Sequence, residues 1–369
     1  MLISIHLYIL YIYTLFFPKI KYNGKMRRTT THNNNNFYFV LLLSIAIVLL
    51  SPFSRTSSPS RETLTFSMVS DLDRDSKDVE NPFLWRSVKK TGLLIPLENS
   101  SNYTIHFDVN SSVLLTSRTA TKSRSMELSA AIKYRNKSFV FCDATGSVLR
   151  LRDNKVYPRQ QILSGSGKTS KPFKTEWATV KDDMIWLGSN GKEWVDEQGR
   201  VVHRMLEWIK TIDRTGRIRN IDWASNYRAL RTVTNTTFPG YLWNEAVEWD
   251  ESIRRFVILP RKESSDIPYD PIRDETLGSN LLLLADETFE NITVRRLEPF
   301  ESDWGFSAVR QIPNDPEKYL ALKVKEVNGT TSTKLTVFDL HGRYYLYPEP
   351  YLEITDLDKN VKFEGLLFD

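Results

Sequence analysis

The sequence predicts an all-β protein built as a five-bladed β-propeller. Three observations support this: short strand-like runs are separated by polar turns, long helical periodicity is nearly absent, and one motif recurs five times. The motif places a Glu or Ser oxygen inside a strand-like run and recurs about every 60 residues. Its copies lie at residues 126–129, 175–178, 244–247, 306–309 and 363–366. Such repeats, rich in short strands, are typical of propeller blades.

The first 66 residues are expected to direct and tether the chain. Residues 1–36 form a cytosolic or leader segment, apolar over 1–17, and residues 37–53 have the length of a signal peptide core or a short signal anchor. Basic residues precede the second apolar run, which predicts that the C-terminal part is luminal or extracellular. A start at Met26 instead of Met1 predicts the same compartment. Residues 54–66, rich in Ser, Thr, Arg and Pro, are expected to form a stem.

The net charge of +5 is unevenly distributed along the chain. Residues 1–69 contain seven basic residues and one acidic residue, so the remainder is close to neutral. A nearly neutral main domain lacks the basic surface that nucleic-acid binding requires. The sequence therefore predicts no nucleic-acid partner.

Glycosylation acceptors support a secretory compartment. Seven Asn-x-Ser/Thr sites without an intervening Pro follow the apolar run, at Asn99, Asn102, Asn110, Asn136, Asn235, Asn291 and Asn328. Cys142 is the single cysteine, so an intrachain disulfide is excluded. We expect a type II membrane glycoprotein on the luminal face of the endoplasmic reticulum or Golgi, or a secreted protein if the anchor is cleaved.

The propeller domain is expected to cover residues 67–369. Strand–turn–strand patterns occur at 132–141, 180–187 and 247–258, and a further strand is expected at 335–338. Residues 201–212 are the best helical candidate. The last motif lies at the C-terminus with no outer strands after it, so it is expected to complete a blade formed by residues 67–125. This closure removes open sheet edges and predicts that the last seven residues are essential.

The repeated motif predicts a metal centre. The innermost strand of each blade lines a central channel, so carboxylates repeated on these strands would converge on one axis. Several acids in a narrow channel raise each other's pKa unless a cation neutralises them. A hard, oxygen-seeking cation such as Ca²⁺ suits this position.

Nine short motifs in order resemble the calcium-activated nucleotidases, also called calcium-dependent apyrases, over residues 69–368. They are Val-Ser-Asp-Leu-Asp (69–73), Ser-Met-Glu-Leu-Ser (125–129), Phe-Lys-Thr-Glu-Trp-Ala (173–178), Gly-Lys-Glu-Trp (191–194), Pro-Gly-Tyr-Leu (239–242), Leu-Pro-Arg (259–261), Gly-Phe-Ser (305–307), Ala-Leu-Lys (321–323) and Lys-Phe-Glu-Gly (362–365). The resemblance implies a five-bladed propeller that holds one calcium ion and hydrolyses nucleoside di- and triphosphates such as UDP, GDP, ADP or ATP.

The resemblance also implies site residues. The calcium ligands would be Ser129, Glu176, Glu245, Ser307 and Glu364. Phosphoanhydride hydrolysis needs cations on phosphate oxygens and a carboxylate that orients water. Candidate phosphate-binding residues are Lys174, Lys192, Arg254, Arg255 and Arg261, and candidate carboxylates are Asp71, Asp73, Asp143 and Glu193. Trp194 is expected to stack on the base. Neither H-E-x-x-H nor G-x-S-x-G occurs, so zinc hydrolysis and a serine triad have no sequence support.

The chain departs from the family pattern at three places. Ala130 replaces an acid, Cys142 and Ala144 replace an acid and an arginine, and residues 164–168 replace an acidic segment. These departures leave open an alternative function, a non-catalytic calcium-stabilised propeller that binds a nucleotide or a glycoprotein. A homodimer is also left open.

Overall fold

The computed structural model describes residues 61–355, 358 and 360–369. The expected leader, the apolar segment at 37–53 and residues 54–60 of the stem lie outside these residues. Within the described residues, no helix is both long and apolar enough to cross a membrane. The first strand begins at Leu64, three residues before the expected start of the propeller.

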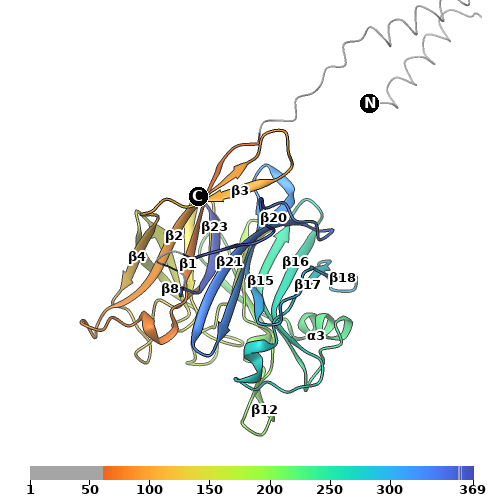
Figure 1. Cartoon of the computed structure of the whole chain (residues 1–369). Coiled ribbons are helices and arrows are strands. Elements are labelled where there is room, and N and C mark those ends of the chain that lie inside the picture. Colours follow the sequence, from red (N-terminus) through yellow and green to blue (C-terminus); the bar gives the residue numbers. More distant parts are fainter. Residues whose placement is uncertain (1–60, 356–357, 359) are drawn as a thin grey trace, which may run out of the picture. The chain divides into compact units, whose positions relative to one another are not determined.

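Five antiparallel sheets form the blades of a β-propeller, as predicted (Figure 1). Blade 1 contains β23 (Phe363–Phe368), β1 (Leu64–Ser70), β2 (Trp85–Pro96), β3 (Tyr103–His106) and β4 (Ser112–Ser117). Blade 2 contains β5 (Leu128–Tyr134), β6 (Lys137–Cys142), β7 (Ser147–Arg152) and β8 (Lys155–Gln161). Blade 3 contains β9 (Trp177–Lys181), β10 (Met184–Gly188), β13 (Trp208–Ile212) and β14 (Ile218–Asp222).

The other two blades have four strands each. Blade 4 contains β15 (Tyr241–Asp250), β16 (Arg255–Ser264), β17 (Leu281–Ala285) and β18 (Ile292–Arg296). Blade 5 contains β19 (Trp304–Ile312), β20 (Asp315–Val327), β21 (Thr330–Asp339) and β22 (Leu352–Glu353). A separate two-stranded ribbon of β11 (Trp194–Val195) and β12 (Val201–His203) projects from the loop between β10 and β13.

The innermost strands β5, β9, β15, β19 and β23 contact one another in that order, and β23 contacts β5, so the ring is closed. Closure depends on β23, which pairs antiparallel with β1 (Phe66 opposite Phe368, Val69 opposite Gly365). This confirms the expectation that the last motif completes the first blade. A Cβ on Gly365 would lie 2.5 Å from Val69 Cγ2 and 2.9 Å from the Ala130 carbonyl carbon, so only glycine fits there.

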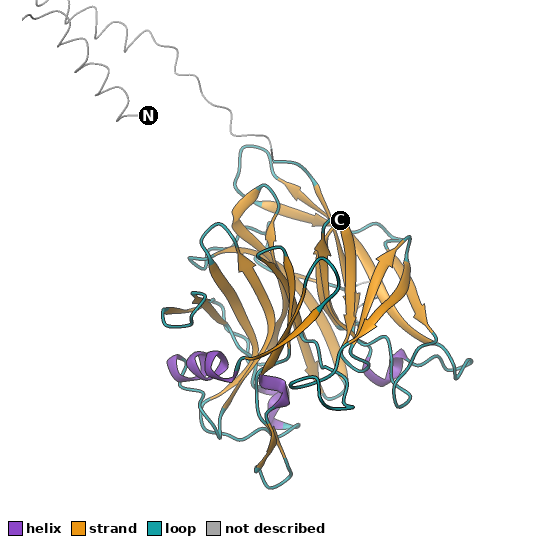
Figure 2. Cartoon of the chain, turned by 180° about the vertical axis from the view of Figure 1, so that it is seen from behind, coloured by secondary structure: helices purple, strands orange, loops and turns teal. Residues whose placement is uncertain are grey.

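Short helical segments gather at one end of the propeller (Figure 2). They are η1 (Asp73–Ser76), η2 (Met205–Glu207), α3 (Ala224–Val233) and η3 (Arg273–Thr276). The predicted helix over 201–212 was wrong: β12, η2 and β13 occupy this range, because Val, Ile, Thr and Trp favour extended backbone. The true helix α3 buries Tyr227, Leu230 and Arg231 at helical spacing.

Candidate active site

Five oxygen-bearing side chains, here called the hub, meet at the centre of the propeller. They are the predicted metal ligands Ser129, Glu176, Glu245, Ser307 and Glu364. All five are buried and line one cavity of about 10 Å³, room for about one water-sized occupant. The structure therefore brings together every residue that the repeated motif placed on an inner strand as a metal ligand.

A β-bulge directs each hub side chain toward the axis. The strand registers skip Ser129, Glu245, Ser307 and Glu364, so each is the extra residue on its inner strand. In blade 3 the backbone N–H of Glu176 donates to Gly188 O (2.8 Å), although Gly188 already pairs with Trp177. A bulge bends the strand and re-aims the extra side chain, and repetition in all five blades makes five such side chains converge.

The hub donors fit a hard cation. Ser129 Oγ is buried and has no hydrogen-bond partner among the described residues. Ser307 Oγ donates to Phe363 O (3.0 Å), so its lone pairs are free to accept or coordinate. With three carboxylates, the hub offers only oxygen ligands, the donor set that Ca²⁺ prefers. We conclude that these residues could hold a calcium ion.

Burial raises the pKa of two hub acids, Glu245 and Glu364. Burial raises the pKa of Glu245 to about 7, and nearby Glu176 raises it further, against the lowering effect of Arg261. Burial also raises the pKa of Glu364 well above its usual range, although Lys362 opposes the shift. A divalent cation at the hub would favour the ionised form of both groups.

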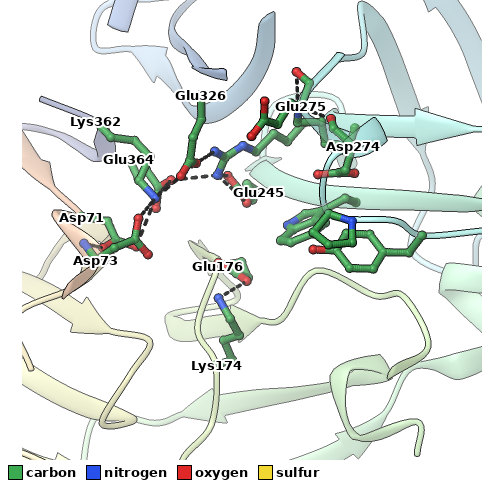
Figure 3. A pocket seen from close by; sticks show the side chains of 15 residues that line it. Asp71, Asp73, Lys174, Glu176, Glu245, Asp274, Glu275, Glu326, Lys362 and Glu364 are labelled. Carbon is green, nitrogen blue, oxygen red and sulfur yellow. Dashed lines mark hydrogen bonds and ion pairs between the residues drawn. The ribbon is translucent and has the colours of Figure 1, made fainter. Parts of the chain in front are cut away.

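Three basic side chains lie against the hub carboxylates, and Figure 3 labels two of them, Lys174 and Lys362. Lys174 Nζ lies 2.6 Å from Asp143 Oδ2 and 2.8 Å from Glu176 Oε1. Arg261 Nη1 donates to Glu245 (3.0 and 2.9 Å) and to Glu364 Oε1 (2.8 Å). Lys362 Nζ lies 3.5 Å from Glu364 Oε1. These cations stand between the hub and the solvent, where an anionic substrate would arrive.

The cleft above the hub has a volume of about 310 Å³. Its lining includes Glu176, Glu245 and Glu364 of the hub and the aromatic side chains of Trp243 and Tyr269. Other lining residues are Asp71, Asp73, Lys174, Arg261, Lys262, Pro271, Asp274, Glu275, Glu326 and Lys362. The cleft is therefore acidic and basic around the hub and aromatic on the side of blade 4.

Lys362 and Trp243 also line the cleft, although neither was predicted as a site residue, and both share one position in the repeated motif. Each lies two residues before a hub oxygen, as Lys174 does before Glu176. The same offset in equivalent motifs places residues at equivalent positions around the axis, so these three side chains reach the cleft together. The spacing could have identified both residues from the sequence.

A second group of acids lies beside the cleft. Carboxylate oxygens of Asp71, Asp73 and Glu127 lie within 4.8 Å of one another, a spacing that could also hold a metal ion. Lys362 lies 2.8 Å from Asp73, and Arg124 donates to Glu127 from Nε (2.8 Å). Internal cations neutralise part of the charge here, as they do at the hub. The hub differs because it also holds a buried hydroxyl, Ser129 Oγ, without a hydrogen-bond partner among the described residues, and it therefore fits a cation better.

The acids beside the cleft differ in pKa. Burial raises the pKa of Asp71 to about 6, although Lys362 opposes the shift. Although burial acts to raise it, the pKa of Asp73 is lowered, mainly by the neighbouring Lys362. Asp143 is buried behind Lys174 and leaves Oδ1 without a hydrogen-bond partner among the described residues. Among the cleft carboxylates outside the hub, Asp71 is therefore the one best suited to exchange a proton near neutral pH.

Six of the predicted catalytic and substrate-binding residues do not line the cleft: Asp143, Lys192, Glu193, Trp194, Arg254 and Arg255. Arg254 ends the turn after β15 and Arg255 begins β16, so both lie beyond the end of β15, whereas Glu245 lies in the middle of that strand. Arg254 pairs with Glu287. Glu193 forms a buried ion pair with Arg231. Trp194 is 49% exposed and stacks on His203 (5.8 Å).

Lys192 supports the aromatic side of the cleft from behind. Its Nζ lies 3.7 Å from the Tyr269 ring centre and 5.3 Å from the Trp243 ring centre. Burial lowers the pKa of Lys192 to about 8. The side chain is therefore positioned to orient the two rings.

An ion pair closes the hub on the side away from the cleft. Arg310 Nη1 lies 3.0 Å from Glu248 Oε2, and its Nη2 donates to Ala131 O. Ala130, Ala308 and Val247 supply the apolar part of this floor. The cleft is therefore the open side of the hub among the described residues.

Comparisons with known proteins agree with this geometry. The sequence model of the apyrase family matches residues 72–368. Relatives include an apyrase of Cimex lectularius (34% identity; 82% of this chain and 81% of the relative) and soluble calcium-activated nucleotidase 1 of Rattus norvegicus (36%; 86% and 76%). An apyrase of Phlebotomus duboscqi is 33% identical over 84% of this chain and 90% of its own length. The chain therefore belongs to the apyrase family, a family of nucleotide-hydrolysing enzymes.

Proposed function

We propose that this enzyme hydrolyses the terminal phosphoanhydride bond of nucleoside di- and triphosphates with Ca²⁺ at the hub. The observation that carries the proposal is the convergence of five oxygen donors in one cavity directly beneath a cleft with four basic side chains. The name of the rat relative, a calcium-activated nucleotidase, supports the choice of cation. UDP, GDP, ADP and ATP are the proposed substrates.

The basic side chains over the hub would bind the phosphate oxygens. Lys174, Arg261 and Lys362 come from three blades and surround the hub carboxylates. Fixed cations in a partly buried site stabilise the charge that develops on the transferred phosphoryl group. A calcium ion at the hub would supply further positive charge to the phosphate oxygens and to the attacking water.

Asp71 is the proposed acceptor of the water proton. Its carboxylate lines the cleft, and its pKa of about 6 leaves it mostly ionised but basic at neutral pH. Water would attack the terminal phosphorus, its proton would pass to Asp71, and the anhydride P–O bond would break to release inorganic phosphate. Asp143 would position Lys174 through the 2.6 Å ion pair.

Trp243 and Tyr269 are the proposed base-binding residues in place of Trp194. Their ring centres lie 6.0 Å apart on one wall of the cleft. We expect Trp243→Ala to raise KM about tenfold with a smaller change in kcat, because base stacking contributes about 1–3 kcal/mol. Steady-state kinetics with ADP and UDP measure this effect. Trp194→Ala is the matched control and should change KM little; a larger effect at Trp194 would contradict the proposal.

Phosphate release tests the proposed function. Purified full-length protein is assayed with UDP, GDP, ADP and ATP at millimolar calcium and again with a chelator. Calcium-dependent release of phosphate is expected. Chelator-resistant turnover would contradict the calcium mechanism, whereas calcium-dependent melting without any phosphate release would favour the non-catalytic alternative.

Calcium is expected to stabilise the fold in a pH-dependent way. The raised pKa values of Glu245 and Glu364 mean that, without the ion, stability is lost as pH rises through the folded-state pKa of about 7 for Glu245. Calcium should offset this loss at pH 8, by about 3 kcal/mol at 100 times its Kd, and stabilise little at about pH 5, where protons compete. Thermal melting at both pH values measures the difference. An equal calcium-induced rise in Tm at both would contradict a carboxylate hub.

The proposed place of action is the lumen of the endoplasmic reticulum or Golgi, or the outside of the cell. Six of the seven sequon asparagines are exposed, and Asn102 is half-buried. The tether proposed for residues 37–53 and a homodimer stay predictions. In a glycosylating compartment, the enzyme would remove nucleoside diphosphates left by glycosyl transfer.

A further inference from the structure

The hairpin between β20 and β21 ends in the tight turn Asn328-Gly329. Val327 pairs with Thr330, so these two residues alone form the turn. Both have positive φ (51° and 72°), the conformation that a type I′ turn requires and that Asn and Gly adopt readily. The same residues form the sequon Asn328-Gly329-Thr330.

This turn forms part of the rim of the active-site cleft. The Asn328 backbone N–H donates to Glu275 Oε2 (3.0 Å), and Glu275 lines the cleft above the hub. Gly329 and Thr330 line an adjoining hollow of about 550 Å³, which shares Asp71, Asp73 and Lys362 with the cleft. The turn therefore stands at the boundary between the two hollows.

The turn has space for a large substituent. Asn328 and Thr330 are exposed, and a Cβ added at Gly329 would meet no atom within 4 Å. The hydrogen bond to Glu275 uses the backbone N–H, so the side-chain amide of Asn328 is not needed for it. A group attached to this amide would leave the contact with blade 4 intact.

We propose that Asn328 carries an N-linked glycan that stands at the cleft entrance and limits substrates by the size of the group beyond the phosphates. The bond forms between Asn328 Nδ2 and the anomeric carbon of an oligosaccharide donated by a polyprenyl diphosphate; the amide loses a proton and the diphosphate leaves. The size limit rests on the proposed hydrolysis of nucleotides at this cleft. Small free nucleotides would pass, whereas nucleotides attached to bulky groups would be hindered by the glycan.

Another sequon provides a matched control. Asn136 also lies in an exposed hairpin turn with positive φ (57°), between β5 and β6. That turn follows the end of β5, whereas Ser129 of the hub lies at its beginning. A glycan on Asn136 would therefore be at the opposite end of the propeller from the cleft.

The test uses the full-length chain made in glycosylating eukaryotic cells. Intact glycopeptide mass spectrometry should find a glycan at Asn328. Asn328→Gly and Asn136→Gly each remove one sequon without adding charge, and glycine also fits a type I′ turn. Hydrolysis of free ADP is compared with that of ADP conjugated through its base to a large polyethylene glycol. Asn328→Gly should raise kcat/KM for the conjugate severalfold relative to free ADP, and Asn136→Gly should leave this ratio unchanged.

Three results would overturn the inference. An unmodified Asn328 beside a modified Asn136 would exclude the rim glycan, and an absence of glycans at all seven sequons would contradict the proposed glycosylating compartment as well. A glycan at Asn328 with the same substrate ratio in both variants would exclude the size limit. Failure to hydrolyse free ADP would contradict the proposed function, a result distinct from glycan occupancy.

Discussion

Deletion of the last seven residues, 363–369, is expected to abolish folding of the propeller. This segment contains β23 (Phe363–Phe368), the innermost strand of blade 1, whose six residues are all buried. Phe363, Leu366, Leu367 and Phe368 would each lose about 1.5–3 kcal/mol of burial. The sum is comparable to the whole stability of a typical domain, about 5–15 kcal/mol. The deletion also removes Glu364 from the hub, leaves β1 without its inner partner strand, and removes the strand that β5 packs against at the closure.

Soluble yield, circular dichroism and limited proteolysis measure this effect. Deletion of Asp369 alone is the control, because this residue is exposed and lies outside β23. It makes two hydrogen bonds: its backbone N–H donates to Thr65 O (2.9 Å), and its Oδ2 accepts from Ser67 Oγ (2.6 Å). That control should fold, at a cost of about 1–3 kcal/mol for the lost hydrogen bonds. A folded, active enzyme without residues 363–369 would show that the ring does not close through its C-terminus.

The substitution Glu245→Gln is expected to weaken calcium binding and to lower activity at limiting calcium by more than tenfold. The change keeps the side-chain size but removes one of three negative charges from the hub. Even residues that only support metal ligands typically contribute 10–100-fold to metal affinity or activity, so a direct ligand should contribute at least as much. Calcium titration by calorimetry and calcium-dependent phosphate release measure the two effects independently.

Glu326→Gln distinguishes loss of a metal ligand from loosening of Arg261. Both Glu245 and Glu326 accept hydrogen bonds from Arg261, at 2.9–3.0 Å and 3.0 Å. Glu326 is 41% exposed in its side chain and lines the cleft but not the hub. Its substitution should therefore leave calcium affinity nearly unchanged. Equal losses of calcium affinity in both variants would show that the loss comes from loosening of Arg261, and would contradict the proposal that Glu245 is a calcium ligand.

The five-bladed fold and the meeting of the hub residues could be predicted from the sequence because both are local patterns. Each hub residue lies in a copy of one motif on an inner strand, and five equivalent strands around an axis bring equivalent positions together. The bulges that aim Ser129 and Glu364 inward were not predicted, since a bulge depends on the register with the partner strand. The bulged residue is in each case the Glu or Ser of the repeated motif, so the predicted ligands were correct although the bulges were not foreseen.

The cleft around the hub was only partly predictable. Lys174 and Arg261 were selected and line it, whereas Arg254 and Arg255 were selected and lie at the far end of their strands. A basic residue in a strand–turn–strand run gives no sign of which end of the propeller it occupies. The position of a residue relative to the hub residue of its motif does indicate the end, because the position two residues before the hub residue identifies Lys362 and Trp243 as cleft residues.

By itself the sequence determined the repeat, the closure through the C-terminal strand and the oxygen donors of the hub, since these depend on strand periodicity and residue type. Only the tertiary structure decided which side chains from different blades share the cleft, that Trp243 and not Trp194 faces it, and that Asp71 is buried enough to have a raised pKa. The physical reason is that burial and contacts between blades join residues far apart in the chain, and no local pattern encodes those distances.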